Sequence, residues 1–147
     1  MKAVIQVVNG ATLKVDGEII SQIDKGLVVY FCVEKDDKEE LLDYFTKKIS
    51  NMRIFVDSND KMNLSVKDIG GEILLVSQFT LAGNTEHGNR PSFIGAELPE
   101  RANMLYEKLG EKIEKEYNIK VKFGRFGADM KITQENSGPV TIILNNK

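Results

Sequence analysis

The sequence predicts an α+β or mixed-sheet protein with two helices on one face of the sheet, and two observations carry that prediction. Short apolar segments of strand-like pattern recur along the chain, and two longer segments between them have apolar residues at helical spacing. The expected order is strands, helix, strands, helix, strands, which differs from the regular alternation of a doubly wound parallel fold.

Four strand-like segments are expected at the start of the chain. Residues 3–8 are almost entirely apolar, as in a half-buried strand. Asp16-Gly17 lies between the strand-like segments 12–15 and 18–20, and Asp-Gly supplies the positive φ angles that a two-residue hairpin turn needs. A continuous apolar run at 27–33 is typical of a central strand that is buried on both faces.

Two helices follow from capping signals and apolar spacing. In the acidic segment 36–40, Asp36 with Glu39 or Asp37 with Glu40 resembles a capping pair at a helix start. The apolar helical repeats comprise Leu41, Leu42, Phe45 and Ile49, then Ala102, Leu105, Tyr106, Leu109 and Ile113 after a favourable first-turn proline, Pro99. The remaining strands are expected near 53–56, 73–76, 121–123, 130–132 and 140–144.

Composition excludes several classes of protein. The 147 residues predict one domain, and no apolar segment approaches the length of a membrane span. The single cysteine, Cys32, forms no intramolecular disulfide and fits a cytoplasmic setting, and the Cys and His counts exclude a zinc site of those residues. A net charge of −2 means that any contact with nucleic acid must use a local patch. No phosphate loop, dinucleotide pattern or metal motif is present.

Two polar segments beside apolar strands are the strongest candidates for a functional site. Ser77-Gln78-Phe79-Thr80-Leu81 follows the apolar run 73–76, and extended backbone there would place Gln78 and Thr80 on one face as a polar cluster. Gly138-Pro139 precedes the last strand and can direct backbone carbonyls outward, toward a ligand ammonium group. Each segment has a structural alternative: a satisfied strand end for the first and an ordinary turn for the second.

An ordered set of motifs across the chain resembles the bacterial and eukaryotic type of D-aminoacyl-tRNA deacylase. The motifs are Val33-Glu34-Lys35-Asp36-Asp37, Arg53-Ile54-Phe55, Lys61-Met62-Asn63-Leu64, Ser77-Gln78-Phe79-Thr80-Leu81, Arg90-Pro91-Ser92-Phe93, Gly124-Arg125-Phe126, Ala128-Asp129-Met130 and Gly138-Pro139-Val140-Thr141. The set covers nearly the whole chain, and its order makes the resemblance far more specific than any one tetrapeptide.

The resemblance implies both an activity and an assembly. Members hydrolyse the ester that joins a D-amino acid to the 3′-terminal adenosine of tRNA, and they remove glycine mischarged onto tRNA for alanine. The chain is therefore expected to be a cytoplasmic homodimer of one domain, residues 1–147, with a largely antiparallel, barrel-like mixed sheet. No metal or organic cofactor, no membrane and no DNA partner is expected.

The resemblance also assigns roles to residues. It implies that Ser77, Gln78 and Thr80 are catalytic and that Phe79 and Met130 bind substrate. It implies that the bond in Gly138-Pro139 is cis, and that this pair enters the partner subunit's site, holds the α-ammonium group and excludes L side chains. The chain departs from the family where it carries Val7 in place of a common Arg that clasps the Gly-Pro pair. It departs again at Cys32 and Ser137, where Gly and Asp are common.

The mechanism is expected to need no strong side-chain base. Water would attack with help from the tRNA 2′-hydroxyl, and N–H groups near Phe79 and Thr80 would stabilise the oxyanion. In the rival mechanism Thr80 is a nucleophile, which requires an activating base. Two other functions remain open from the sequence: a noncatalytic tRNA- or RNA-binding dimer of the same fold, and a small-molecule hydrolase unrelated to tRNA.

Overall fold

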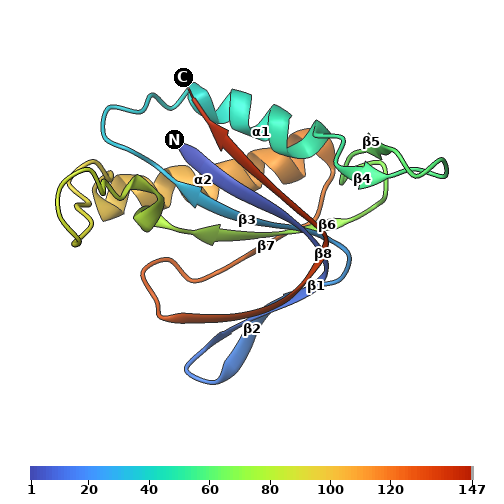
Figure 1. Cartoon of the computed structure of the whole chain (residues 1–147), viewed down its shortest axis with the longest axis horizontal. Helices are drawn as coiled ribbons and strands as arrows, with labels where there is room; N and C mark the ends of the chain where they lie inside the picture. The colour runs from blue at the N-terminus through green and yellow to red at the C-terminus, as the bar shows by residue number, and fades with distance from the viewer. Residues whose placement is uncertain (147) are drawn as a thin grey trace.

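A strongly curved mixed sheet with two helices on one face forms the molecule in the computed structural model, which describes residues 1–146 (Figure 1). The elements are β1 (Lys2–Val15), β2 (Glu18–Ile23), β3 (Gly26–Cys32), α1 (Leu41–Asn51), β4 (Phe55–Val56), β5 (Met62–Leu64), β6 (Glu72–Ser77), the 3₁₀ turn η1 (Phe79–Ala82), α2 (Pro99–Tyr117), β7 (Val121–Phe123) and β8 (Met130–Asn145). Lys147, the last residue of the predicted domain, lies outside the described residues. No helix of residues 1–146 is long and apolar enough to cross a membrane.

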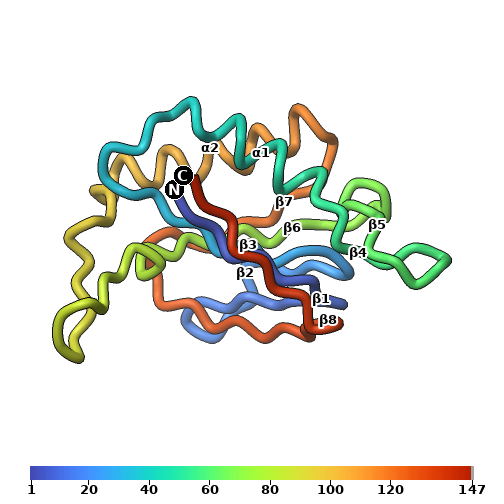
Figure 2. The backbone as a smooth tube through the Cα atoms, turned by 45° about the horizontal axis from the view of Figure 1, so that its top comes forward, coloured from blue at the N-terminus to red at the C-terminus, as the bar shows by residue number. Residues whose placement is uncertain are grey.

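The sheet order β2-β1-β3-β6-β7, with β8 along β1, explains the position of the helices. β1 is antiparallel to β2, β3 and β8, whereas β3, β6 and β7 run parallel. The two parallel connections pass through α1 and α2 and advance across the sheet in the same direction. Crossover connections between parallel strands are right-handed, so two connections that advance in the same direction place their helices on the same face. Both helices therefore cover the same side of the sheet (Figures 1 and 2). The predicted fold class, including the nearly closed, barrel-like sheet, is confirmed.

Two apolar layers fill the two faces of the sheet. The larger layer lies under the helices and includes Phe31, Phe45, Leu75 and Leu105. A smaller layer on the other face gathers residues such as Leu74 under the curved hairpin of β1 with β2. The central strands β3 and β6 contribute to both layers, so the continuous apolar run at 27–33 correctly predicts a strand that is buried on both sides.

Three local predictions are wrong, and each has a physical cause. The α1 helix begins without a side-chain cap, because Asp37 instead accepts hydrogen bonds from the Met1 ammonium group and from the Glu34 N–H, the latter at 2.7 Å. The backbone is not extended as far as residue 81, because β6 ends at Ser77 and the 3₁₀ turn η1 begins at Phe79. The two expected C-terminal strands are one strand, β8, since both halves pair with the same long β1.

Candidate active site

A mostly apolar cavity of about 280 Å³ opens where β6 ends, between the sheet and the start of α2. Ser77, Gln78 and Phe79 lie in its wall, as three of the residues singled out in the sequence. The rest of the lining consists of residues that the sequence did not predict as site residues: Phe31, Cys32, Val33, Ala96, Glu97, Pro99, Ala102, Tyr106, Phe126 and Gly127. The motif around Phe126 and the apolar face of α2 were visible in the sequence, but only the fold brings them together.

The polar end of the cavity is a tight turn. Gln78 leaves the strand conformation, with φ −143° and ψ 75°, and η1 follows at once. The Gln78 side-chain amide donates a 2.5 Å hydrogen bond to the Thr80 hydroxyl. The predicted Gln78–Thr80 cluster therefore exists, but a 3₁₀ turn forms it and not an extended strand.

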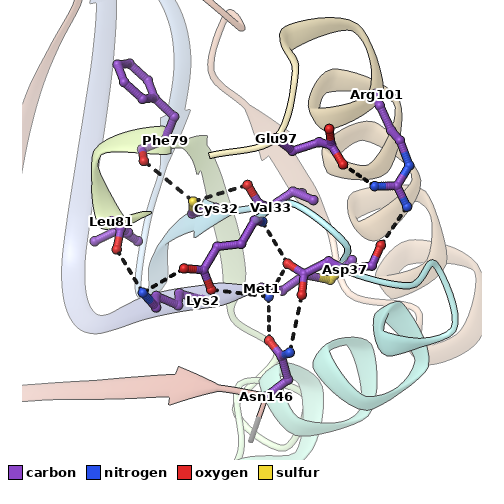
Figure 3. A network of polar contacts seen from close by, with 11 residues as sticks. Met1, Lys2, Cys32, Val33, Asp37, Phe79, Leu81, Glu97, Arg101 and Asn146 are labelled. Atoms are coloured by element: carbon purple, nitrogen blue, oxygen red, sulfur yellow. Dashed lines mark hydrogen bonds and ion pairs between the residues drawn. The ribbon is translucent and has the colours of Figure 1, made fainter. Parts of the chain in front are cut away.

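Neighbouring strands hold the carbonyl groups of this turn (Figure 3). The Cys32 thiol of β3 donates to the Phe79 carbonyl at 3.6 Å, and the Lys2 ammonium group of β1 donates to the Leu81 carbonyl at 3.4 Å. The Phe79 ring meets Phe93 edge to face, with centroids 5.3 Å apart, yet remains 58% exposed. Within residues 1–146, no hydrogen bond uses the N–H groups of Phe79 or Thr80, so both remain available to a ligand.

The titratable groups of the cavity wall are poorly suited to act as bases. Burial raises the pKa of Tyr106, whose hydroxyl donates a 2.7 Å hydrogen bond to the Leu75 carbonyl. The Leu98 N–H, and then the Arg101 guanidinium, lower the pKa of Glu97. The single histidine, His87, lines a separate hollow together with Lys2. In the described part of the chain, no three His, Cys, Asp or Glu side chains gather as a metal site.

Cys32 is expected to be an inert thiol at neutral pH. Burial, followed by the charge of Glu34, raises the pKa of Cys32 to about 11. A spectrophotometric thiolate titration should therefore have its midpoint near pH 11, and alkylation by iodoacetamide at neutral pH should be slow. Because the unfolded chain loses this proton first, the free energy of unfolding should fall as the pH rises between the usual thiol pKa and that value. Cys32→Ala should abolish the titration, and a midpoint at the usual thiol pKa would contradict the buried position.

The structure places Gly138-Pro139 away from this cavity. The pair is exposed, its peptide bond is cis, and it lies in an irregular part of β8 opposite Val7. In the strand register, Val7 of β1 pairs with Leu27 of β3, and Leu27 pairs with Ile73 of β6. Ile73 precedes Ser77 by four residues on β6. Strand spacings then separate Gly138-Pro139 from Ser77 by about 13 Å along the strands and about 14 Å across them.

Met130 also lies apart from the cavity residues. It is paired with Val15 and packs against the smaller apolar layer on the face opposite the helices. Its sulfur lies close to Gly124, where an added Cβ would come within 2.7 Å. One chain thus brings Ser77, Gln78 and Phe79 into the cavity wall and holds Thr80 beside them through the Gln78 hydrogen bond. Neither Met130 nor Gly138-Pro139 lines the cavity.

The fold and the cavity together define an α+β protein whose candidate site offers hydroxyl, amide and backbone groups. The profile of the family described as D-Tyr-tRNA(Tyr) deacylase matches residues 4–145. A D-aminoacyl-tRNA deacylase of Thermosipho melanesiensis is 54% identical over 147 residues, which is 100% of this chain and 98% of that relative. The chain therefore belongs to the D-Tyr-tRNA(Tyr) deacylase family.

Two solved structures are similar over almost their whole length. The c-Myc DNA unwinding element binding protein superposes with a TM-score of 0.94 at 40% identity, covering 100% of this chain and 99% of that protein. A structure described as that of a probable eukaryotic D-amino acid tRNA deacylase has a TM-score of 0.83 over 97% of each chain. At 18% identity, the second similarity concerns the fold alone.

Proposed function

We propose that this protein hydrolyses the ester bond of D-aminoacyl-tRNA in the cytoplasm, releases the free D-amino acid and tRNA, and also clears glycine from tRNA for alanine. The observation that carries the proposal is the turn at the end of β6. It presents the N–H groups of Phe79 and Thr80, which have no hydrogen-bond partner among residues 1–146, and the Thr80 hydroxyl beside an apolar cavity. Family membership supplies the substrate class, and the mostly apolar cavity of about 280 Å³ would receive the aminoacyl or adenosine group.

The chemistry needs little from the protein beyond a stabilised oxyanion. An aminoacyl ester is activated, so water can attack its carbonyl carbon with help from the neighbouring 2′-hydroxyl of the terminal adenosine. The ester C–O bond then breaks, and the ribose oxygen takes a proton. The N–H groups of Phe79 and Thr80 would donate to the developing oxyanion. Thr80 itself contacts an amide, which is not a base, so this environment supports a hydrogen-bonding role over a nucleophilic one.

Selection against L-amino acids is proposed to come from a second copy of the chain. Gly138-Pro139 is exposed and too far from Thr80 within one chain, so a homodimer would insert this pair into the partner's cavity. Its carbonyls would bind the α-ammonium group and leave no room for an L side chain. Exposed apolar residues beside both segments, Phe79 at 58% and Ile143 at 73%, are consistent with an interface that covers them.

The test is deacylation of D-tyrosyl-tRNA, compared with L-tyrosyl-tRNA, glycyl-tRNA for alanine and a free D-tyrosine ester. We expect rapid loss of D-tyrosine and glycine from tRNA, no cleavage of the L-ester above background, and a dimer in sedimentation. Binding of tRNA without cleavage of any substrate would instead support a noncatalytic RNA-binding dimer. Preference for the free ester would support a small-molecule hydrolase, and efficient L-tyrosyl-tRNA cleavage would overturn the exclusion mechanism.

A further inference from the structure

A network of side-chain hydrogen bonds lies beside the Gly138-Pro139 segment, on the sheet face opposite the helices. Gln6 of β1 is at its centre: its amide donates to the Thr141 hydroxyl at 3.2 Å, and its amide oxygen accepts from the Gln134 amide at 2.8 Å. The Gln134 amide group also donates to Asn136 at 2.5 Å and accepts from the Tyr30 hydroxyl at 2.9 Å. The network thus joins β1 and β3 to residues on both sides of Gly138-Pro139.

The ladder between β1 and β8 is interrupted where this network lies. Gln6 pairs with Thr141 and Val8 pairs with Asn136, so residues 137–140 of β8 face only Val7. Because four residues of β8 lie opposite a single residue of β1, residues 137–140 cannot form regular backbone pairs with β1. Contacts at the two ends of this segment therefore fix its position. Gln6 contacts one residue on each side of the interruption, Gln134 before it and Thr141 after it.

The residue opposite the interruption does not provide this hold. Val7 is 5% exposed and belongs to the apolar layer under the helices, so its side chain offers no hydrogen bond to residues 137–140. Gln6 points to the other face and is half-buried, where an amide with both donor and acceptor satisfied is stable. Burial raises the pKa of Tyr30, which keeps its hydroxyl as a donor to Gln134.

We propose that Gln6 is a positioning residue for chirality reading: its two hydrogen bonds fix the ends of residues 137–140, and so set where the Gly138-Pro139 carbonyls point. The inference rests on the proposed function, because it assumes that these carbonyls bind the substrate's α-ammonium group. That group has the same charge in the ground state and the transition state. Loss of the two Gln6 hydrogen bonds should therefore weaken substrate binding more than it slows the chemical step.

The test is Gln6→Ala, measured with D-tyrosyl-tRNA and L-tyrosyl-tRNA. We expect KM for the D-substrate to rise about tenfold with kcat changed by less than about twofold, and the D-to-L ratio of kcat/KM to fall. Gln6→Glu should restore most of the loss, because a carboxylate accepts from Gln134 and from the Thr141 hydroxyl. Amide hydrogen exchange should become faster at Val140 and Thr141 in the alanine variant.

Asn9→Ala is the matched control, since Asn9 also bridges β1 and β8, at 2.8 Å to Glu135, but contacts only one side of the interruption. Its kinetics should equal those of the unmodified protein. If Gln6→Ala does not fold, Thr141→Val removes one of the two bonds at nearly constant volume and should raise KM about threefold. Unchanged KM and discrimination in Gln6→Ala would overturn the inference and leave the proposed function intact. An unmodified protein that fails to cleave D-tyrosyl-tRNA would instead overturn the function.

Discussion

Gly138→Ala should lower kcat/KM for D-tyrosyl-tRNA about 100-fold and raise the relative rate on L-tyrosyl-tRNA. Gly138 has φ +114°, which L side chains rarely adopt, and an added Cβ would lie 2.8 Å from Val140 Cγ2 and 3.0 Å from the Val140 nitrogen. The backbone must therefore shift at the pair whose carbonyls are proposed to hold the ammonium group. Steady-state kinetics on both substrates would measure the change.

Gly17→Ala separates this effect from strain at a positive φ alone. Gly17 has φ +81° in the hairpin turn between β1 and β2, but an added Cβ there has no neighbour within 4 Å. Its kinetics should be unchanged, although its thermal midpoint should fall slightly. If Gly138→Ala is folded and retains both its rate and its discrimination, the pair does not read chirality.

Local chemistry explains why much of the fold was predictable. Asp16-Gly17 allows both positive φ angles, 50° and 81°, so the hairpin follows from two neighbouring residues. Pro99 at the first turn and the apolar spacing behind it define α2 in the same way. In β8, Gly138-Pro139 indicated a break, but the long β1 pairs on both sides of it and the strand continues.

The site was predicted less completely because tertiary contacts build it. Ser77 and Thr80 were identified, yet nothing near them in sequence signals a 3₁₀ turn. Hydrogen bonds from Cys32 and Lys2 hold the carbonyls of that turn, and both donors lie far away along the chain. The same holds for Phe126, which reaches the cavity wall only because β7 adds to the sheet beside β6. Asp37 is the converse case. Local spacing predicted that its carboxylate caps a helix, but the carboxylate accepts a hydrogen bond from the distant Met1 ammonium group instead.

Thr80→Ala should reduce kcat on D-tyrosyl-tRNA about 10- to 100-fold without abolishing turnover, and KM should change little. The hydroxyl is proposed to donate one hydrogen bond that strengthens in the transition state, while the two N–H groups of the turn remain in the variant. Thr80→Ser should retain most of the activity. Thr133→Ala, at an exposed position of β8, serves as the control and should leave kcat unchanged. Complete loss of turnover with intact binding would favour the nucleophile mechanism.

The same variant also tests whether each site is shared between subunits. If Thr80 and Gly138-Pro139 of different chains form one site, a mixed dimer of Thr80→Ala with Gly138→Ala has one site with both changes and one with neither. Random exchange makes about half of the dimers mixed, so remixing two impaired proteins should restore about a quarter of the unmodified activity. A site built within one chain would give no recovery, since every chain carries a lesion. Within a single chain, the strand register keeps Thr80 far from Gly138-Pro139. Recovery of activity is therefore expected only if the two segments of one site come from different chains.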